Sequence, residues 1–227
     1  IFSLDLTVAS LVPLLMASIS AVLTSYFFFG NEVLFHINIT DDFNVEESGY
    51  YLILGLFTAL VSIYFSKVFL AMNQWFKRYS SPFKRLLIGG SALGIIIFFV
   101  PPLYGEGYDT INHVLSGNIS DVLESNFFNF QEETFWYVSF LLLGLIFLKV
   151  TAMSLTSGAG GIGGVFAPTL FTGSISGFLI AYVINHLNVF ANDVSLSNFS
   201  MVGMAGLIAG VLHAPLTAIF LIAEITE

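Results

Sequence analysis

The sequence predicts an all-α membrane protein, a polytopic chain built from tilted and broken transmembrane helices. Three observations support this fold class. First, 56% of the 227 residues are hydrophobic and only 9% are charged, a balance too apolar for a soluble domain. Second, several apolar runs reach the roughly 20 residues that cross about 30 Å of hydrocarbon. Third, short apolar segments interrupted by Gly and Pro near the end of the chain are typical of transporters that surround a central site with broken helices.

The N-terminal half is expected to contain three spans: Val8–Phe29, Tyr50–Met72 and Leu86–Tyr104. The loop of residues 31–49 is acidic. All but one of the six Lys and Arg residues lie close to the connection between the second and third spans: Lys67, Lys77, Arg78, Lys84 and Arg85. The positive-inside rule therefore predicts that the loop of residues 73–85 is cytoplasmic and the acidic loop external. A nucleic-acid or lipid-headgroup patch is a competing interpretation, disfavoured because the basic run is short and flanks two spans.

A polar connector follows the third span, which is expected to end at Pro101-Pro102 on the outer side. It covers residues 105–134 and is expected to carry a short helix, Tyr108–Leu123. We expect its carboxylates to be solvated, although a metal site that includes His113 is the alternative. These acids are Glu106, Asp109, Asp121, Glu124, Glu132 and Glu133.

The segment Phe135–Leu155 is expected to cross back inward, and it carries Lys149. A cation inside a membrane segment is costly and is a functional candidate by default. Lys149 either raises the local potential for an anion or extends its amine to the cytoplasmic interface. We favour the interfacial position, with Lys149 as a candidate electrostatic contributor.

Three further apolar helices are expected in the C-terminal part: Val165–Ile184, Phe199–Leu212 and Ala214–Ile225. The last two are too short to span comfortably. His186 is expected in a solvated link and His213 at a helix junction. Glu224 is expected at an interfacial helix end, with proton carriage as the alternative.

The glycine-rich stretch of residues 157–168, between the fourth and fifth apolar segments, is the most informative part of the chain. Its glycines leave backbone amides uncovered, and Val165 to Pro168 are expected to form the first turn of a helix. The first N–H groups of a helix lack intrahelical partners and carry the positive end of its dipole. We therefore expect this stretch to hold a dehydrated anion. A dinucleotide site is disfavoured because the preceding run is too long for a strand, and a flexible hairpin remains an alternative.

Three segments resemble the CLC family of chloride channels and chloride/proton antiporters. The segment TSGAGGIGGVFAPTL (156–170) is similar to the family's G-x-F-x-P region, with Gly164, Phe166 and Pro168 at the three fixed positions. Further similarity covers residues 203–226 and 50–78. The chain is thus identified as a part of the CLC transmembrane domain, residues 1–227, within an inverted-repeat fold of two antiparallel halves. Since the chain starts at Ile1 rather than at an initiator Met, has no basic region at its start, and stops at Glu227 just after an apolar run, we expect both ends to lie inside a longer protein.

The resemblance implies that the backbone amides of Val165 and Phe166 bind the central chloride, while the Phe166 ring walls the pathway. Gly163, Gly164, Ala167 and Pro168 would support this site. The family's other anion-contacting and gating motifs do not occur in the chain. The resemblance also implies a homodimer that pairs through Val8–Phe29 and Met201–Ile225.

The expected function is therefore that of a voltage-gated-type chloride channel or chloride/proton antiporter, with nitrate or fluoride transport as the alternative. No catalytic constellation, metal site or cofactor is predicted, so chloride is the substrate and the protein is not expected to be an enzyme. The expected partners are chloride, protons, the lipid bilayer and a second subunit, but not nucleic acid. We expect the protein in a bacterial inner membrane.

Overall fold

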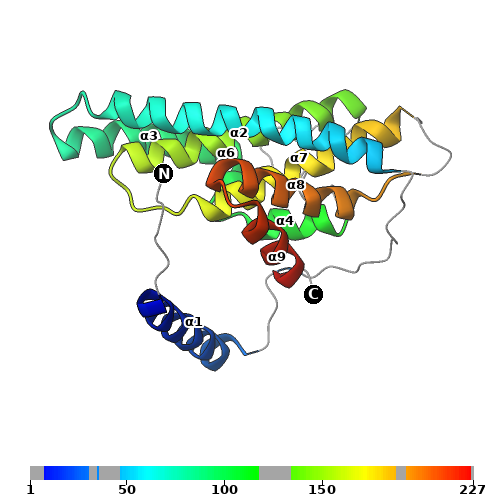
Figure 1. Ribbon diagram of the computed structural model, residues 1–227. Helices are drawn as coiled ribbons and strands as arrows, with labels where there is room; N and C mark the ends of the chain where they lie inside the picture. Colours follow the sequence, from blue (N-terminus) through cyan, green and yellow to red (C-terminus); the bar gives the residue numbers. More distant parts are fainter. Residues whose placement is uncertain (1–7, 31–34, 36–46, 118–133, 188–192, 226–227) are drawn as a thin grey trace. The chain divides into compact units, whose positions relative to one another are not determined.

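The computed structural model describes residues 8–30, 35, 47–117, 134–187 and 193–225, and these residues form helices and connections without any strand (Figure 1). The chain divides into two units, Ile1–Leu34 and Phe35–Glu227. The helices are α1 (Val8–Phe29), α2 (Ser48–Phe76), α3 (Pro82–Phe99), the 3₁₀ turn η2 (Pro101–Leu103), α4 (Tyr108–Leu115), α6 (Phe135–Gly158), α7 (Phe166–His186), α8 (Leu196–Leu212) and α9 (Pro215–Ile225).

The first unit consists of α1, which begins and ends where the sequence predicts. The helix continues through Pro13. Its hydroxyl groups bond to its own backbone: Ser20 donates to the Met16 carbonyl and Thr24 to the Ser20 carbonyl, both at 2.7 Å. Apolar side chains such as Phe27 are exposed. A helix with satisfied polar groups and an apolar surface suits a lipid environment or a partner helix.

The second unit is organised around α7, which packs against both α6 and α8. Helix α8 also packs against α2 and α9, while α3 packs against α6, and α4 against α7 and α8. Figure 1 shows α2 running along one edge of this unit. Among the described residues, α2, α3, α6 and α7 are long and apolar enough to cross a membrane. The sequence-based fold class, an all-α polytopic membrane protein, is therefore confirmed.

The central helix α7 buries several polar side chains, and most of their hydroxyl groups donate hydrogen bonds to carbonyl groups of the same helix. Thr169 donates to the Val165 carbonyl and Thr172 to the Pro168 carbonyl, each at 2.7 Å, and Ser176 donates to the Thr172 carbonyl at 2.6 Å. These bonds within the helix allow a partly polar helix to sit in the interior, where an unpaired hydroxyl costs free energy.

Close backbone contact between α7 and α8 depends on glycine. A Cβ atom at Gly173 would lie 2.7 Å from the Gly203 carbonyl oxygen, and one at Gly177 would overlap the Phe199 carbonyl. Small residues at such crossings let two helix backbones approach each other. The small-residue face that Gly173 and Gly177 form is thus occupied by α8.

The broken C-terminal helices are confirmed, and the break lies at His213. This residue has a left-handed backbone (φ 56°) and caps α8, and α9 begins at Pro215. Helix α8 starts earlier than predicted, at Leu196, because the Ser195 hydroxyl accepts a hydrogen bond from the Asn198 amide at 3.3 Å. His186 was predicted in a solvated link, but it is the last residue of α7, and its ring stacks on Phe135 with centroids 3.8 Å apart.

The connector after α3 differs from its prediction. Helix α3 ends at Phe99 rather than Tyr104, because Pro101 and Pro102 start the 3₁₀ turn η2. Helix α4 ends at Leu115 rather than Leu123, and it buries its apolar face against α7 and α8. The apolar face of α4 therefore packs into the second unit, while the carboxylates of Glu106 and Asp109 are exposed, in line with the solvated acids that the sequence predicts. Residues 118–133 and most of the acidic loop of residues 31–49 lie outside the described part of the chain.

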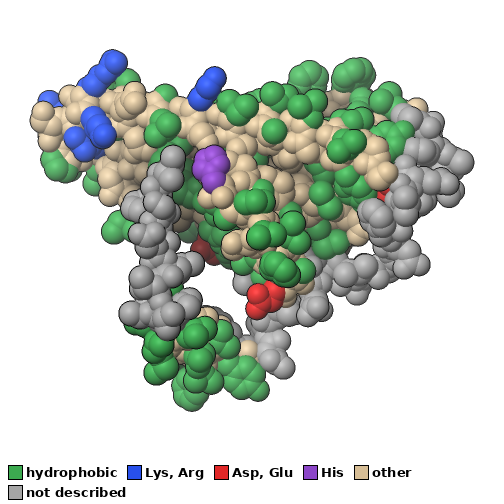
Figure 2. All heavy atoms as spheres, viewed as in Figure 1, with side chains coloured by type: hydrophobic (Ala, Val, Ile, Leu, Met, Phe, Trp, Pro, Cys, Tyr) green, Lys and Arg blue, Asp and Glu red, His purple; other side chains and the backbone are tan. Residues whose placement is uncertain are grey.

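The surface of the second unit separates charge from apolar side chains. Figure 2 shows the Lys and Arg side chains gathered mainly at the end of the unit where α2 meets α3, while hydrophobic side chains cover much of the visible helices. Helix α2 exposes Leu52 and Leu56, and α3 exposes Phe83 and Ile95. Exposed apolar faces on helices of spanning length are typical of lipid-facing surfaces.

Candidate functional site

The glycine-rich stretch connects the end of α6 to the start of α7. Its first part caps α6: the Ala159 amide bonds to the Leu155 carbonyl at 2.9 Å, and the Gly161 amide to the Thr156 carbonyl at 2.9 Å. Gly160, with φ 99°, makes the turn between them. The chain then reaches α7 without another backbone bond of this kind in the described residues.

The start of α7 leaves its first amides available. Val165 is the N-cap residue, and no side chain caps the helix there. The amide of Thr169 is the first to bond backward to the N-cap, reaching the Val165 carbonyl at 3.1 Å. The N–H groups before Thr169 therefore have no helical acceptor, as the geometry of a helix start requires. These donors carry the positive end of the helix dipole.

A cavity of about 590 Å³ lies at this helix start. The walls come from the end of α3, the turn that follows it, α6, the glycine-rich stretch and the first turn of α7. Six of the residues that the sequence singled out line this one cavity: Lys149, Gly163, Gly164, Phe166, Ala167 and Pro168. The Phe166 ring is 39% exposed, so it faces open space rather than the core.

Val165 is the predicted site residue that does not line the cavity. Its side chain instead packs against the buried cluster of Phe65, Val150 and Met153. This packing fixes the N-cap position against α2 and α6. Any contribution of Val165 to a ligand must come from its backbone.

Lys149 is buried, which corrects its predicted interfacial position. It is 2% exposed, and its Nζ donates to the carbonyl oxygens of Gly105 at 3.0 Å and Leu103 at 3.3 Å. The same Nζ lies 4.5 Å from the centroid of the Phe171 ring. Carbonyl dipoles and an aromatic face offset part of the cost of burying a charge. The amine therefore turns inward, toward the cavity.

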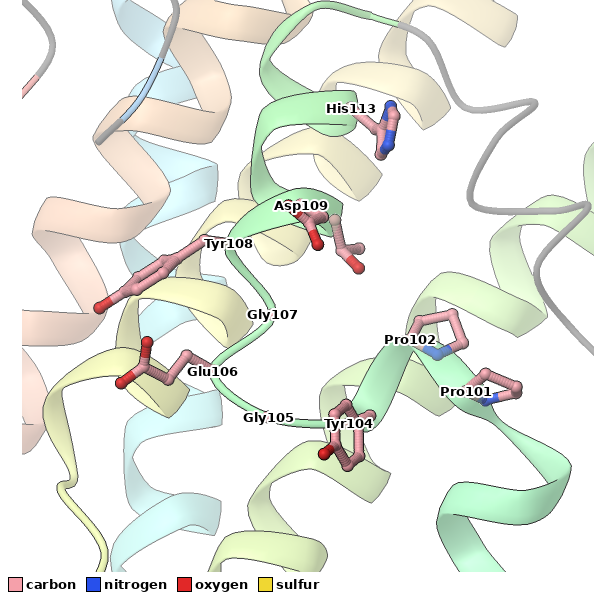
Figure 3. A pocket seen from close by; sticks show the side chains of 10 residues that line it. Pro101, Pro102, Tyr104, Gly105, Glu106, Gly107, Tyr108, Asp109 and His113 are labelled. Carbon is pink, nitrogen blue, oxygen red and sulfur yellow. The ribbon is translucent and has the colours of Figure 1, made fainter. Parts of the chain in front are cut away.

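The turn of residues 104–107 separates this cavity from a second one of about 480 Å³. Glu106 lines both. Figure 3 shows the Glu106 and Tyr108 side chains on one side of the turn, while Asp109 and His113 lie on the other. Burial and the nearby Glu106 charge raise the pKa of Tyr108 above its ordinary value. No group of three His, Asp or Glu side chains in the described ranges is placed to bind a metal ion.

The family model described as "Voltage gated chloride channel" matches residues 1–227. The chain belongs to this family. Among its relatives are the voltage-gated ClC-type chloride channel ClcB of Citrobacter koseri, 28% identical over 97% of this chain and 49% of the relative. A ClcB-like protein of Ralstonia nicotianae is 31% identical over 97% of this chain and 47% of the relative. ClcB of Escherichia coli O139:H28 is 26% identical over 96% and 48%. The chain thus spans about half the length of these curated relatives.

Membership of the voltage-gated chloride channel family confirms the resemblance to the CLC family that residues 156–170 indicated. It also identifies the chain as part of a membrane protein. The sequence did not reveal that Glu106 lines this cavity, because little in its neighbourhood set it apart from the other acidic residues of the connector. Its one distinguishing signal is the pair of flanking glycines, both with positive φ: 59° at Gly105 and 86° at Gly107. Glycine adopts a positive φ at little cost, and this turn places the Gly105 carbonyl 3.0 Å from the Lys149 Nζ.

Proposed function

We propose that the full-length protein transports chloride across the membrane through a site at the start of α7. The observation that carries this proposal is the single cavity that Lys149, Gly163, Gly164 and Phe166 line together. The backbone amides of Val165 and Phe166 are the proposed donors to the ion. The relatives, which are named as chloride channels, support the choice of chloride.

The proposed site acts by replacing water around the anion. Amides at a helix start offer aligned N–H groups and about half a positive charge. The buried ammonium of Lys149 adds a full positive charge at the cavity wall without donating directly to the ion, since its hydrogen bonds go to Gly105 and Leu103. Dipoles bind an anion less tightly than a direct ion pair would, and transport requires that the ion also leave.

The direct test is anion flux in liposomes that contain the full-length protein. Chloride, nitrate and fluoride are compared at equal gradients, with protein-free vesicles as the blank. We expect the chloride flux to exceed the fluoride flux. Fluoride is more strongly hydrated than chloride, so amide dipoles compensate less of its dehydration cost. A fluoride flux above that of chloride would reject chloride as the substrate in favour of the alternative.

We propose further that two subunits pair, with α1 and the segment Met201–Ile225 of α8 and α9 at the interface, and that protons accompany chloride if the protein is an antiporter. Leu216, Ile219 and Phe220 of α9 are exposed apolar side chains available for such pairing. Mass measurement in detergent tests the dimer, and chloride-driven pH change inside vesicles tests the proton movement.

We also propose a bacterial inner-membrane location with the loop of residues 73–85 in the cytoplasm. Labelling of cysteines introduced into this loop, from either side of the membrane, would test its orientation.

A further inference from the structure

A groove of about 560 Å³ lies between α2 and α3, at the end of the second unit where the two helices are joined. Leu155 of α6, 5% exposed, lies at its base. Apolar side chains provide most of the lining, and one cation stands among them. The residues that carry the argument are Met72, Trp75, Ile88, Ala92, Leu155 and Arg78.

The walls of the groove are held in place by contacts outside it. The Trp75 ring packs edge-on against Phe76 and Tyr79, with centroids 4.9 and 5.2 Å away. Phe76 is fully buried, and the Arg85 Nε donates to the Tyr79 carbonyl at 2.6 Å. The groove therefore exists before any ligand arrives, which lowers the entropy cost of binding.

The charged side chains of α2, α3 and the connection between them all have the same sign. The sequence contains no Asp or Glu between Glu47 and Glu106, a stretch that contains five of the six Lys and Arg residues. Lys77, Arg78 and Lys84 are exposed at the joined end of α2 and α3, and Figure 2 shows the cations gathered there. Arg85 is committed to the Tyr79 carbonyl, so the other three are left to attract an anion.

We propose that this groove binds one anionic phospholipid, with an acyl chain against Trp75 and Ile88 and the phosphate beside Arg78. Basic pockets between transmembrane helices are suited to anionic headgroups, and Trp and Tyr are favoured at the depth of the headgroups. A free phosphate would leave the apolar wall uncovered, and a zwitterionic lipid would leave the cations unneutralised. The proposal depends on neither chloride transport nor the side of the membrane on which this end lies.

Native mass spectrometry of the full-length protein in detergent tests the proposal, with phosphatidylglycerol and phosphatidylcholine titrated separately. We expect one phosphatidylglycerol per subunit to persist at concentrations where phosphatidylcholine is lost. Arg78→Gln should weaken the phosphatidylglycerol affinity about fivefold, the effect of one charge near a lipid headgroup. Lys67→Gln is the matched control, since Lys67 is an exposed cation on α2 that does not line the groove.

A second variant tests the groove rather than the charge. Ala92→Phe should fill the space between the helices and reduce phosphatidylglycerol binding, although every cation remains. Thermal unfolding verifies that each variant is folded, and if Ala92→Phe fails to fold, the Arg78→Gln comparison decides. Equal binding of the two lipids, an equal effect of Arg78→Gln and Lys67→Gln, or unchanged binding in a folded Ala92→Phe would each overturn the site.

Discussion

The ammonium nitrogen of Lys149 lies 3.0 Å from the carbonyl oxygen of Gly105. This hydrogen bond joins the middle of α6 to the turn that follows α3, and it holds the turn at the wall of the cavity beside the start of α7. One side chain thus supplies both a positive charge and a structural tie. Variants at this position and its neighbours can separate the two roles.

Lys149→Met should reduce chloride flux roughly tenfold, because even a fixed charge about 10 Å from an anion is worth about 1–2 kcal/mol at an effective dielectric near 20. Flux per folded protein in liposomes is the measurement. Lys149→Arg keeps the charge and should recover much of the flux, and Lys67→Met should have no effect. Full flux in folded Lys149→Met would show that the charge plays no part.

Phe166→Ala should alter chloride flux more than Phe140→Ala. Phe166 lines the cavity, whereas Phe140 is 69% exposed on α6 and does not line it. Phe171 is unsuitable as a control, because it is fully buried and its ring lies 4.5 Å from the Lys149 amine. Phe171→Ala would therefore cost about 3–5 kcal/mol through a core cavity and would disturb Lys149 as well. Equal flux in Phe166→Ala and Phe140→Ala would remove the Phe166 ring from the pathway.

Glu106→Gln should raise the apparent affinity for chloride by about threefold, because it removes a partly screened negative charge from the cavity wall. Asp109→Asn is the matched control, since Asp109 lies on the other side of the turn and lines only the second cavity. The concentration dependence of chloride flux measures both. If both substitutions act equally, the effect reflects overall charge rather than the cavity.

Gly107→Ala should destabilise the protein more than Gly117→Ala. Both glycines have positive φ, 86° and 72°, so both variants bear a similar backbone cost. Only at Gly107 would the new Cβ approach other groups, at 2.5 Å from the Phe171 ring and 3.2 Å from the Lys149 Nζ. The added crowding is worth about 1–3 kcal/mol. Thermal unfolding in detergent measures the difference in stability between the two variants. Equal melting temperatures would show that the turn at Gly107 shifts to accommodate the Cβ atom at little cost.

Gly177→Ala should lower the melting temperature strongly, whereas Gly90→Ala should leave it nearly unchanged. A Cβ atom at Gly177 would overlap the Phe199 carbonyl of α8, while one at Gly90 would meet nothing within 4 Å. Unfolding of both variants in the same detergent measures this. A mild effect at Gly177 would mean that α7 and α8 can separate without loss of stability.

Local signals in the sequence predicted the helices and the cavity motif well. The start of α7 was placed within one residue, because Gly163 and Gly164 loosen the backbone and Pro168 suits a first helical turn. The third span was predicted to reach Tyr104 with its end at Pro101-Pro102, and α3 ends slightly earlier, at Phe99, because the two prolines start η2. The anion-binding role of the Val165 and Phe166 amides stays a prediction.

The sequence by itself determined the membrane class, the order of the helices, the break at His213 and the family, because each depends on composition or on neighbouring residues. Only the tertiary structure decided where Lys149 points. Its partner Gly105 is 44 residues away along the chain, and no periodicity or propensity reports on a contact across such a distance. Only the tertiary structure likewise showed that Glu106 lines the cavity and that a groove lies beside Arg78. Both the cavity and the groove are formed by helices that meet only when the chain is folded.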